Sequence, residues 1–291
     1  MSVKFGVFLP TDDLEAAKTA AIAAEAQGYY SVSTNDHFYS PLGAHDTPQL
    51  ECMITLTTVA AATSRIRLAP AVIAASFRTP ALLAKMVSTL DIASGGRFIC
   101  GLGAGWQDAE YIAHGYEFPP LKQRLQQLDE TVRILRAMFD EDDPGFAGEH
   151  FTVEHAYNQP RPVQEHVPIM LGGSGTGLLR IAARHADILN MIPPTGNGRD
   201  FVNDKAATLA FTMEKLLERI DVVKRFLDAE QRDHEALELG GLCLLAVSRD
   251  ANDGSLRALA EQLGFPDYEA AQRSPVALLG TPDEVSEELS R

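Results

Sequence analysis

The sequence predicts an α/β fold of the TIM (β/α)8-barrel type, in one domain over residues 1–291 with an inserted excursion at about 140–165. Short segments rich in β-branched and aromatic residues alternate with Ala- and Leu-rich helical segments, an order typical of a parallel sheet. The chain has 291 residues, and one such barrel takes roughly 250. It lacks the G-x-G-x-x-G fingerprint of an open dinucleotide-binding sheet, which favours the closed barrel.

The composition narrows the class of protein. Hydrophobic residues make up 45% of the chain, enough for a large core, yet no segment approaches the roughly 20 apolar residues of a membrane span. The formal net charge of −15 disfavours binding to nucleic acid. Three separated cysteines indicate buried thiols in a reducing compartment. The sequence enters a strand without a signal peptide, so we expect a cytoplasmic protein.

The expected elements follow one another in regular order. The strands are expected at 3–9, 29–34, 65–73, 97–102, 168–173, 187–192 and 238–247, with a short apolar segment at 276–280. The helices are expected at 14–28, 51–63, 79–96, 121–139, 177–186, 205–229 and 254–263, with a last helix starting at Thr281. The polar segment 140–162 is rich in turn residues and predicts an excursion with a small hairpin.

Local signals fix the ends of two of these helices. We expect Asp12 or Asp13 to cap the first helix and Gly28 to end it. We expect Thr79 to cap the third helix, with a proline in its first turn, and Gly95 to end it.

Glycine occupies every second position at the end of the fourth strand, in GLGAGW (101–106). A third glycine of the dinucleotide fingerprint belongs at position 106, where Trp106 stands. For a bare G-x-G-x-G the simpler interpretation is a strand that ends in a flexible turn. Trp106, the only tryptophan, either covers a flat ligand at the barrel mouth or packs on a loop.

Residues that directly follow a strand are the candidates for chemistry, because active sites of such barrels lie at the carboxyl ends of the strands. Asp36 and His37 follow the second strand and suit acid–base catalysis or contact with a cofactor. The alternative is that Asp36 caps a turn and His37 packs. The histidines are scattered without ligand spacing, so we expect no metal site.

The segment GGSGTG (172–177) stands between the fifth strand and a helix. Glycines let the backbone approach an anion closely, and the start of a helix presents free N–H groups and the positive end of the helix dipole. We therefore interpret Gly172, Gly173, Ser174 and Gly175 as a site for a phosphate or phosphodiester. The alternative is a tight turn between strand and helix, a common use of glycine.

Together, the blocks LDIASGGRF, GLGAGW and EY within residues 64–118, flanked by DHF (36–38), QPRPVQEHVPIMLGGSG (159–175) and RIAARHADILN (180–190), resemble the luciferase-like monooxygenase superfamily. More narrowly they resemble its branch that uses the deazaflavin coenzyme F420. The resemblance covers nearly the whole chain. It implies a (β/α)8 barrel with insertions, usually a homodimer, that holds the flat ring of the cofactor in the barrel mouth.

The resemblance also implies roles for single residues. The positions that match cofactor contacts are Asp36, Ala71, Val72, Gly103, Ala104, Gly105, Trp106, Gly172, Gly173, Ser174 and Gly175. Ala71–Val72 match a strand bulge whose cis peptide supports the ring. The alternate glycines are then expected to keep side chains away from a flat cofactor. One departure concerns Trp106, because some deazaflavin dehydrogenases carry a catalytic Glu there, and Glu110 is not an obvious substitute.

The function expected from these residues is hydride transfer between F420 and a small organic substrate. His37 is the first candidate to supply or accept a proton, with Asp36 as its partner or as a ring contact. The alternatives are an FMN monooxygenase fed by a separate reductase, a flavin-binding protein without turnover and a non-redox barrel enzyme that binds a phosphorylated metabolite. The loops 38–50 and 193–205 are expected to build the substrate pocket, and the sequence leaves the substrate open.

Seven strands are expected by Val247, and in the resembling family GTPDEV begins the helix before the eighth strand. Here the chain ends at Arg291, so we expect a shortened chain with an open gap between the strands at 239–247 and 4–9. The first strand is then paired with the second strand only. The alternative is that VALLG (276–280) takes the eighth place.

Overall fold

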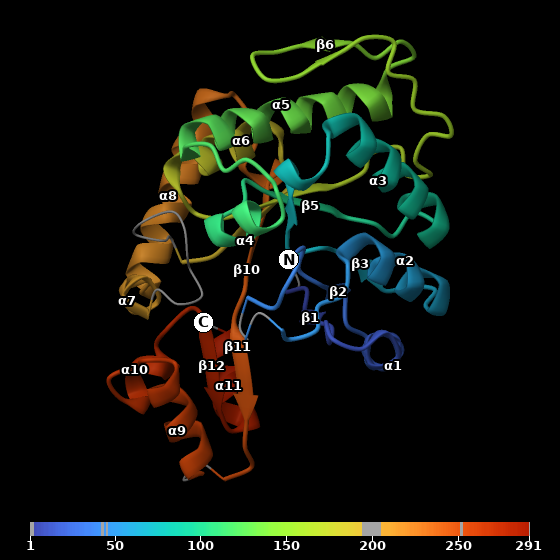
Figure 1. Cartoon of the computed structure of the whole chain (residues 1–291). Helices are drawn as coiled ribbons and strands as arrows, with labels where there is room; N and C mark the ends of the chain where they lie inside the picture. Colours follow the sequence, from blue (N-terminus) through green and yellow to red (C-terminus); the bar gives the residue numbers. More distant parts are fainter. Residues whose placement is uncertain (1–2, 42–43, 45, 194–204, 251–252, 291) are drawn as a thin grey trace. The chain divides into compact units, whose positions relative to one another are not determined.

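The computed structural model describes residues 3–41, 44, 46–193, 205–250 and 253–290. The chain divides into two compact units. The first comprises Met1–Gly172 and His185–Ile188, and the second comprises Gly173–Arg184 and Leu189–Arg291. Figure 1 shows the elements of both units, coloured along the sequence from blue to red.

Parallel strands form the centre of the first unit. They are β1 (Gly6–Phe8), β2 (Ser31–Ser33), β3 (Arg67–Leu68), β4 (Ile73–Ala74), β5 (Cys100–Gly103) and β8 (Ile169–Gly172). β2 pairs with β1 and β3, and β5 pairs with β4 and β8, all in parallel. A single bridge between Leu68 and Phe98 joins the two sets. The predicted alternation of strand and helix, with parallel pairing, is confirmed.

The helices of the first unit are α1 (Leu14–Gln27), α2 (Cys52–Ala62), α3 (Pro80–Ser94), α4 (Asp108–Ala113) and α5 (Leu121–Asp140), with a 3₁₀ turn η1 at Ala75–Phe77. α1, α2, α3 and α5 pack side by side in that order (Figure 1). Asp13 caps α1 through a 2.7 Å hydrogen bond from the backbone N–H of Ala16, and Gly28 ends it at φ 84°. Thr79 precedes α3 without a side-chain cap, and Gly95 ends α3 at φ 68°.

The core of the first unit lies between its strands and these helices. Fully buried side chains come from both sides: Val32, Leu68, Phe98 and Leu102 from the strand segments and Leu56, Leu83, Leu128 and Leu135 from the helices. Burying a Leu or Phe side chain of this kind stabilises a fold by about 1.5–3 kcal/mol. This packing fixes the strand ends that carry the candidate site.

The excursion after α5 contains the predicted hairpin. β6 (Phe146–Ala147) and β7 (Thr152–Val153) pair antiparallel. The buried carboxylate of Glu130 accepts hydrogen bonds from the backbone N–H groups of Glu149, His150 and Phe151 and so holds the hairpin turn onto α5.

The second unit contains α6 (Thr176–His185), β9 (Ile188–Met191), α7 (Lys205–Ala210), α8 (Met213–Ala229), η2 (His234–Ala236), β10 (Glu238–Gly241), β11 (Leu244–Val247), α9 (Gly254–Gln262), α10 (Tyr268–Gln272), β12 (Ala277–Gly280) and α11 (Pro282–Leu289). β11 and β12 pair in parallel. An apolar cluster that includes Phe211, Leu256, Phe265, Tyr268 and Leu279 lies in this unit. Thr281 and Glu284 form a capping box at the start of α11.

Three predicted elements are each divided in the structure. The strand expected at 65–73 is interrupted between β3 and β4, where Pro70 has no N–H to donate and Ala71 N–H binds the carbonyl of Thr34. The helix expected at 205–229 is interrupted because Phe211 is buried in the cluster and Thr212 caps α8. The strand expected at 238–247 becomes β10 and β11, which belong to different sheets. Helices α4 and α10 were not expected.

The pairing of β1 and of β12 tests the expectation for the end of the chain. Among the described residues, β1 has β2 as its only strand partner, as expected. The alternative placement of VALLG beside the first strand is wrong for these residues, since β12 pairs with β11.

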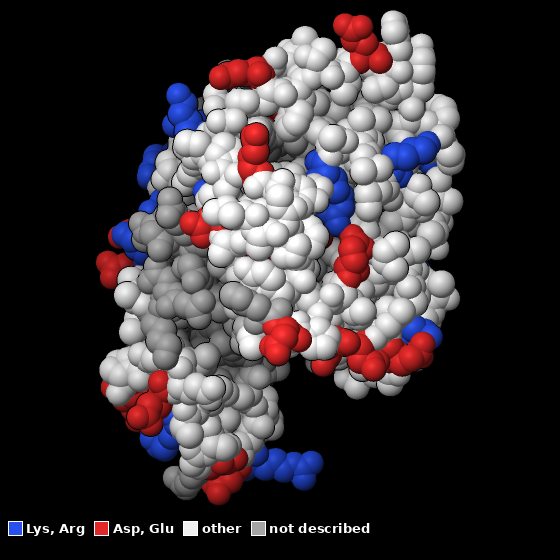
Figure 2. All heavy atoms as spheres, viewed as in Figure 1, with Lys and Arg blue, Asp and Glu red and all other residues white. Residues whose placement is uncertain are grey.

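In the described part of the chain no helix has the length and hydropathy needed to cross a bilayer. On the face seen in Figure 2, wide uncharged areas lie between groups of charged side chains.

Candidate functional site

The loop after β2 and the short helix α4 bring His37 and Glu110 together. The Nδ1 atom of His37 lies 2.8 Å from Oε2 of Glu110, and the other carboxylate oxygen accepts a hydrogen bond from Phe38 N–H. Glu110 is 1% exposed. Because an ionised carboxylate only accepts hydrogen bonds, Nδ1 carries the proton, and Nε2 is the nitrogen able to accept one.

Asp36 lies beside His37 in the chain but binds a different partner. Its carboxylate forms a two-point ion pair with Arg78, at 2.7 and 2.9 Å, and accepts a hydrogen bond from Ala74 N–H. Arg78 also contacts Glu51 at 2.6 Å. Desolvation lowers the pKa of Arg78, but its hydrogen bonds to Asp36 and Glu51 raise that pKa above the ordinary value. The interpretation of Asp36 as the partner of His37 is therefore corrected: Glu110 holds the imidazole.

Aromatic side chains surround His37 and Phe38. The Trp106 ring meets His37 edge-on, with the ring centroids 5.5 Å apart and the planes at 71°. The ring of His114 stacks on that of Phe38 with the centroids 4.2 Å apart, and Phe77 meets Phe38 edge-on with the centroids 5.0 Å apart. The imidazole of His37 thus contacts both an aromatic ring and a buried carboxylate.

The alternate glycines at the end of β5 are required by the packing of the protein itself. A Cβ atom at Gly101 would lie 1.9 Å from the carbonyl oxygen of Pro70, and one at Gly103 would lie 2.6 Å from Val72 Cγ2. A Cβ at Gly172 would also strike Val72, at 2.8 Å. The predicted cis peptide between Ala71 and Val72 is confirmed. These glycines make room for residues 70–72 of the chain itself, and the role toward a flat cofactor that the resemblance implies stays a prediction.

The turn after β5 is held from two sides. Gly105 has φ 75°, and a Cβ there would lie 1.8 Å from the hydroxyl of Tyr111. Tyr111 is 1% exposed and its hydroxyl lies 2.6 Å from Ser76 Oγ. Desolvation raises the pKa of Tyr111 to about 12, so this hydroxyl stays protonated. Arg124 donates to the carbonyl of Gly105, which fixes the backbone of Ala104 and Gly105 at the edge of the site.

In the second unit, the glycine-rich segment leads into α6. Gly173 has φ 141°, a conformation that favours glycine, whereas nothing lies within 4 Å of a Cβ atom built on Gly175. The hydroxyl of Ser174 is buried and donates to the carbonyl of Ile192. Its hydrogen is thus already used, so an anion here is bound by the backbone N–H groups at the start of the helix rather than by this hydroxyl.

A cation lies at the amino end of α6. Arg219 on α8 donates from Nη1 to Thr176 Oγ1 at 3.3 Å. Its Nε is buried, and within the described ranges it has no hydrogen-bond partner. A guanidinium with a spare donor beside free helix N–H groups is the donor set that a phosphate requires. The residues present therefore fit a phosphate-bearing cofactor at this place.

The structure groups the predicted residues into two sets. In the first unit Asp36, His37, Ala71, Val72, Gly103, Ala104, Gly105, Trp106 and Gly172 lie at the carboxyl ends of strands. Gly173, Ser174 and Gly175 lie at the start of α6 in the second unit. The sequence interpretation missed Arg78, Glu110 and Arg219 as partners. An acidic residue shortly after the GLGAGW turn was the visible signal for Glu110, and no local signal marks the other two. Loop residues 194–204, expected to shape a substrate pocket, lie outside the described residues.

Comparisons with known proteins identify the family of the chain. A family model described as luciferase-like monooxygenase matches residues 3–290. An F420-dependent glucose-6-phosphate dehydrogenase of Amycolatopsis mediterranei is 31% identical over 226 residues, covering 75% of this chain and 66% of that protein. One from Kineococcus radiotolerans is 34% identical over 185 residues, covering 63% of this chain and 53% of its own length. The chain thus spans between about half and two thirds of these relatives.

Solved structures show the fold. An F420-dependent secondary alcohol dehydrogenase, in complex with an F420–acetone adduct, superimposes with a TM-score of 0.79 at 21% identity and covers 100% of this chain and 89% of its own. The coenzyme F420-dependent tetrahydromethanopterin reductase of Methanopyrus kandleri gives 0.72 at 19% identity and covers 100% and 90%. Superposition along the full length with such enzymes supports the barrel-type α/β fold expected from the sequence.

Proposed function

The chain belongs to the luciferase-like monooxygenase family, and we propose that it is an oxidoreductase that transfers a hydride between coenzyme F420 and a small organic substrate. One observation supports this most. His37 is oriented by a buried carboxylate, and its ring meets Trp106 in the turn that follows β5. The names of the relatives, which are F420-dependent dehydrogenases, support the choice of cofactor.

The residues that would hold the cofactor fall into two groups. Asp36, Ala71–Val72, the Gly103–Gly105 turn and Trp106 would contact its ring, and the start of α6 with Arg219 would bind its phosphate. When bound, F420 supplies or takes up the hydride. Arg78 neutralises Asp36 and fixes that carboxylate at the strand end.

His37 is proposed to move the proton that accompanies hydride transfer. Its Nδ1–H is held by Glu110, so Nε2 accepts a proton from a substrate hydroxyl or returns one to a carbonyl. Trp106 covers one side of the imidazole and limits the access of water. Each of these roles uses a contact within the first unit.

The substrate is proposed to be an alcohol or carbonyl compound other than a sugar phosphate. Trp106 stands where the resemblance puts a catalytic Glu in some deazaflavin dehydrogenases. Glu110 does not replace it, because both of its carboxylate oxygens are bound, one to His37 and one to Phe38 N–H. We further propose a cytoplasmic homodimer, as is usual in the family.

Spectroscopic titration with F420 and with FMN, followed by mixing with a panel of small alcohols, ketones and sugar phosphates, tests the proposal. We expect F420 binding and substrate-dependent change of its absorbance with a panel member that carries no phosphate. Oxygen uptake with reduced FMN would instead support a monooxygenase. Binding of F420 without turnover across the panel would support a non-catalytic flavin-binding protein, and binding of neither cofactor would support a non-redox enzyme.

A further inference from the structure

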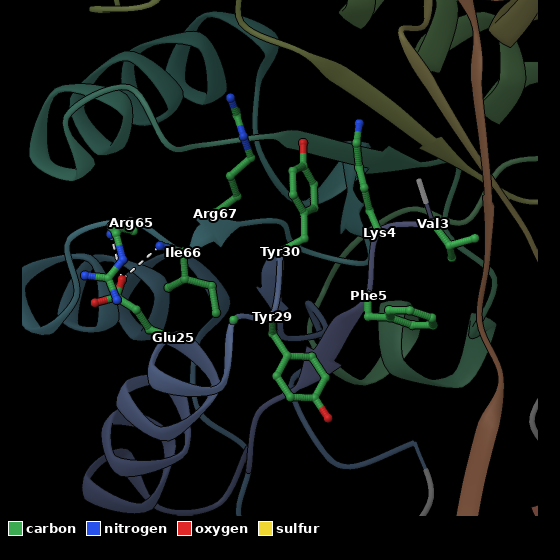
Figure 3. A pocket seen from close by; sticks show the side chains of 10 residues that line it. Val3, Lys4, Phe5, Glu25, Tyr29, Tyr30, Arg65, Ile66 and Arg67 are labelled. Atoms are coloured by element: carbon green, nitrogen blue, oxygen red, sulfur yellow. Dashed lines mark hydrogen bonds between the residues drawn. The ribbon is translucent and has the colours of Figure 1, made fainter. Parts of the chain in front are cut away.

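A pocket of about 470 Å³ lies at the amino ends of β1, β2 and β3, the opposite end of these strands from Asp36 and His37. Figure 3 shows the side chains that line it. Three are cations, Lys4, Arg65 and Arg67, and one is a carboxylate, Glu25. The chain as a whole has a formal net charge of −15. A pocket lined by more cationic than acidic side chains therefore differs in charge from the rest of the chain and favours an anionic ligand.

Three of the lining side chains, those of Lys4, Tyr30 and Arg67, lie in one row (Figure 3). Tyr30 N–H donates to the carbonyl of Phe5 at 2.8 Å, and Arg67 N–H donates to the carbonyl of Tyr30 at 3.0 Å, so the ladder continues past the formal strands. The side chains of Lys4, Tyr30 and Arg67 point the same way in Figure 3.

Tyr30 stands between the two cations of this row. Lys4 Nζ lies 4.9 Å from the centroid of the Tyr30 ring, and Arg67 Cζ lies 5.8 Å from it. Both distances allow cation–π attraction. The ring also packs against the buried cluster of Ala69, Ile99 and Met170. This cluster thus holds the Tyr30 ring in place. The charged ends of Lys4 and Arg67 and the hydroxyl of Tyr30 face the pocket.

Among the described residues, Glu25 forms no ion pair with Arg65 or Arg67. Its carboxylate accepts hydrogen bonds from the backbone N–H groups of Ser64, Arg65 and Ile66. Desolvation raises the pKa of Glu25, but these hydrogen bonds outweigh it and lower the pKa to about 2. In the part of the chain that the structure describes, neither Arg65 nor Arg67 has a salt bridge; Arg67 makes one hydrogen bond of 3.4 Å, to Gln164.

We propose that this pocket binds the diphosphate group of a small phosphorylated metabolite. Arg67 on β3 and Arg65 in the turn before it match an anion with two or more negative charges, and Lys4 also lines the pocket. The planar guanidinium of Arg67 suits the paired oxygens of a phosphate, and the Tyr30 hydroxyl adds a further donor. None of the residues that line the pocket belongs to the glycine-rich start of α6.

Calorimetric titration of the full chain with inorganic pyrophosphate, ADP and adenosine tests this assignment. The chain carries Gly175→Asp in each titration, which blocks the start of α6. We expect pyrophosphate and ADP to bind with similar affinity and adenosine to show no binding. The outcomes that overturn the proposal are the absence of pyrophosphate binding in this background and equal binding of adenosine.

Variants locate the binding in the pocket. Arg67→Gln is expected to weaken pyrophosphate binding by at least about tenfold. Arg65→Gln, an exposed side chain whose loss leaves the strand ladder intact, is expected to weaken it in the same direction. The matched control is Lys224→Gln, an exposed cation on α8, which is expected to leave the affinity unchanged. Equal weakening by Lys224→Gln would show general charge attraction and would overturn the proposed site.

Discussion

The carboxylate of Glu110 lies 2.8 Å from Nδ1 of His37, although 73 positions separate the two residues in the sequence. Its other oxygen binds the N–H of Phe38, so the loop after β2 and the helix α4 are joined at two points. Since Glu110 is 1% exposed, water does not compete for these contacts. The pair defines both the orientation of the imidazole and the nitrogen that carries its proton.

Glu110→Gln should therefore lower turnover while cofactor affinity changes little. The amide keeps the size of the carboxylate, but it cannot accept from both His37 Nδ1–H and Phe38 N–H. An amide donor facing Nδ1 would place the proton of the imidazole on Nε2 and block its role as a base. We expect a loss in kcat on the order of 10² or more, with a changed pH profile.

The control for this variant is Glu117→Gln, an exposed carboxylate that follows α4. It should leave kcat and its pH profile unchanged. Nitrogen NMR of labelled His37 gives a second readout, because the tautomer shifts only if Glu110 sets it. An unchanged tautomer together with full activity would reduce Glu110 to a packing residue.

His37→Ala should reduce turnover far more than cofactor affinity. General acid–base help is worth about 10²–10⁴-fold in rate, and the lost side chain is replaced only by solvent. His155→Ala, in the exposed excursion, is the matched control. If affinity and turnover fall together, His37 binds the cofactor and does not move a proton, and if neither changes it is a packing residue.

The sequence predicted what depends on neighbours along the chain. The start and end of α1 follow from Asp13 and Gly28, and the hairpin at 146–153 follows from turn residues. The interruption between β3 and β4 falls at Ala71–Val72, where the resemblance implied a strand bulge, but the packing of Val72 against glycines of two other strands was not expected. Local propensity carries no information on such contacts.

The candidate site shows the same division. Asp36 and His37 were found because they follow a strand, but their partners were not. Arg78 is 42 positions from Asp36, and Arg219 is 43 positions from Thr176. One sequence shows which side chains carry charge, and only the folded chain shows which of them meet. Because Arg78 pairs with Asp36 at two points, the carboxylate that binds His37 is that of Glu110.

Gly175→Asp should abolish cofactor binding with the fold intact. A Cβ at Gly175 meets no atom within 4 Å, so the new carboxylate has room at the place where a phosphate would lie and repels it. The expected cost is several kcal/mol, roughly a hundredfold or more in affinity. Gly175→Ala separates size from charge and should retain most binding.

Substitution at Gly173 is a less clean test of the same site. Its φ of 141° strains any other residue, and a Cβ there would lie 3.1 Å from Leu178. Gly173→Asp should also abolish binding, but with loss of stability. Fluorescence titration of each variant with F420 gives the affinities, and unchanged affinity in Gly175→Asp would sink the assignment of the phosphate site.

Arg219→Gln should weaken cofactor binding by about tenfold, because one charge-assisted contact to the phosphate is lost. Thr176 and the helix N–H groups remain, so binding is not abolished. Arg225→Gln, an exposed arginine on the same helix, is the control and should bind as the unmodified chain does. The contribution of Arg219 should fall as salt is added, since it is electrostatic. If Arg219→Gln binds the cofactor at low salt as tightly as the unmodified chain does, Arg219 is not part of the phosphate site.

Glu25 should make the stability of the fold depend on pH. Its pKa in the folded chain, about 2, lies below its ordinary value of 4.5, so its ionised form stabilises the fold above pH 4.5. That contribution is lost as the pH falls from 4.5 to about 2.

Glu25→Gln should lower the free energy of unfolding by about 1–3 kcal/mol near neutral pH, since hydrogen bonds to a charged acceptor are lost. The difference between the two chains should shrink as the pH falls below 4.5. Urea unfolding at several pH values between about 7 and 3 measures it. Glu15→Gln, on the same helix with an exposed carboxylate, should change stability by only a few tenths of a kcal/mol at any pH. A constant difference between Glu25→Gln and the unmodified chain across this range would contradict the role given to the ionised carboxylate.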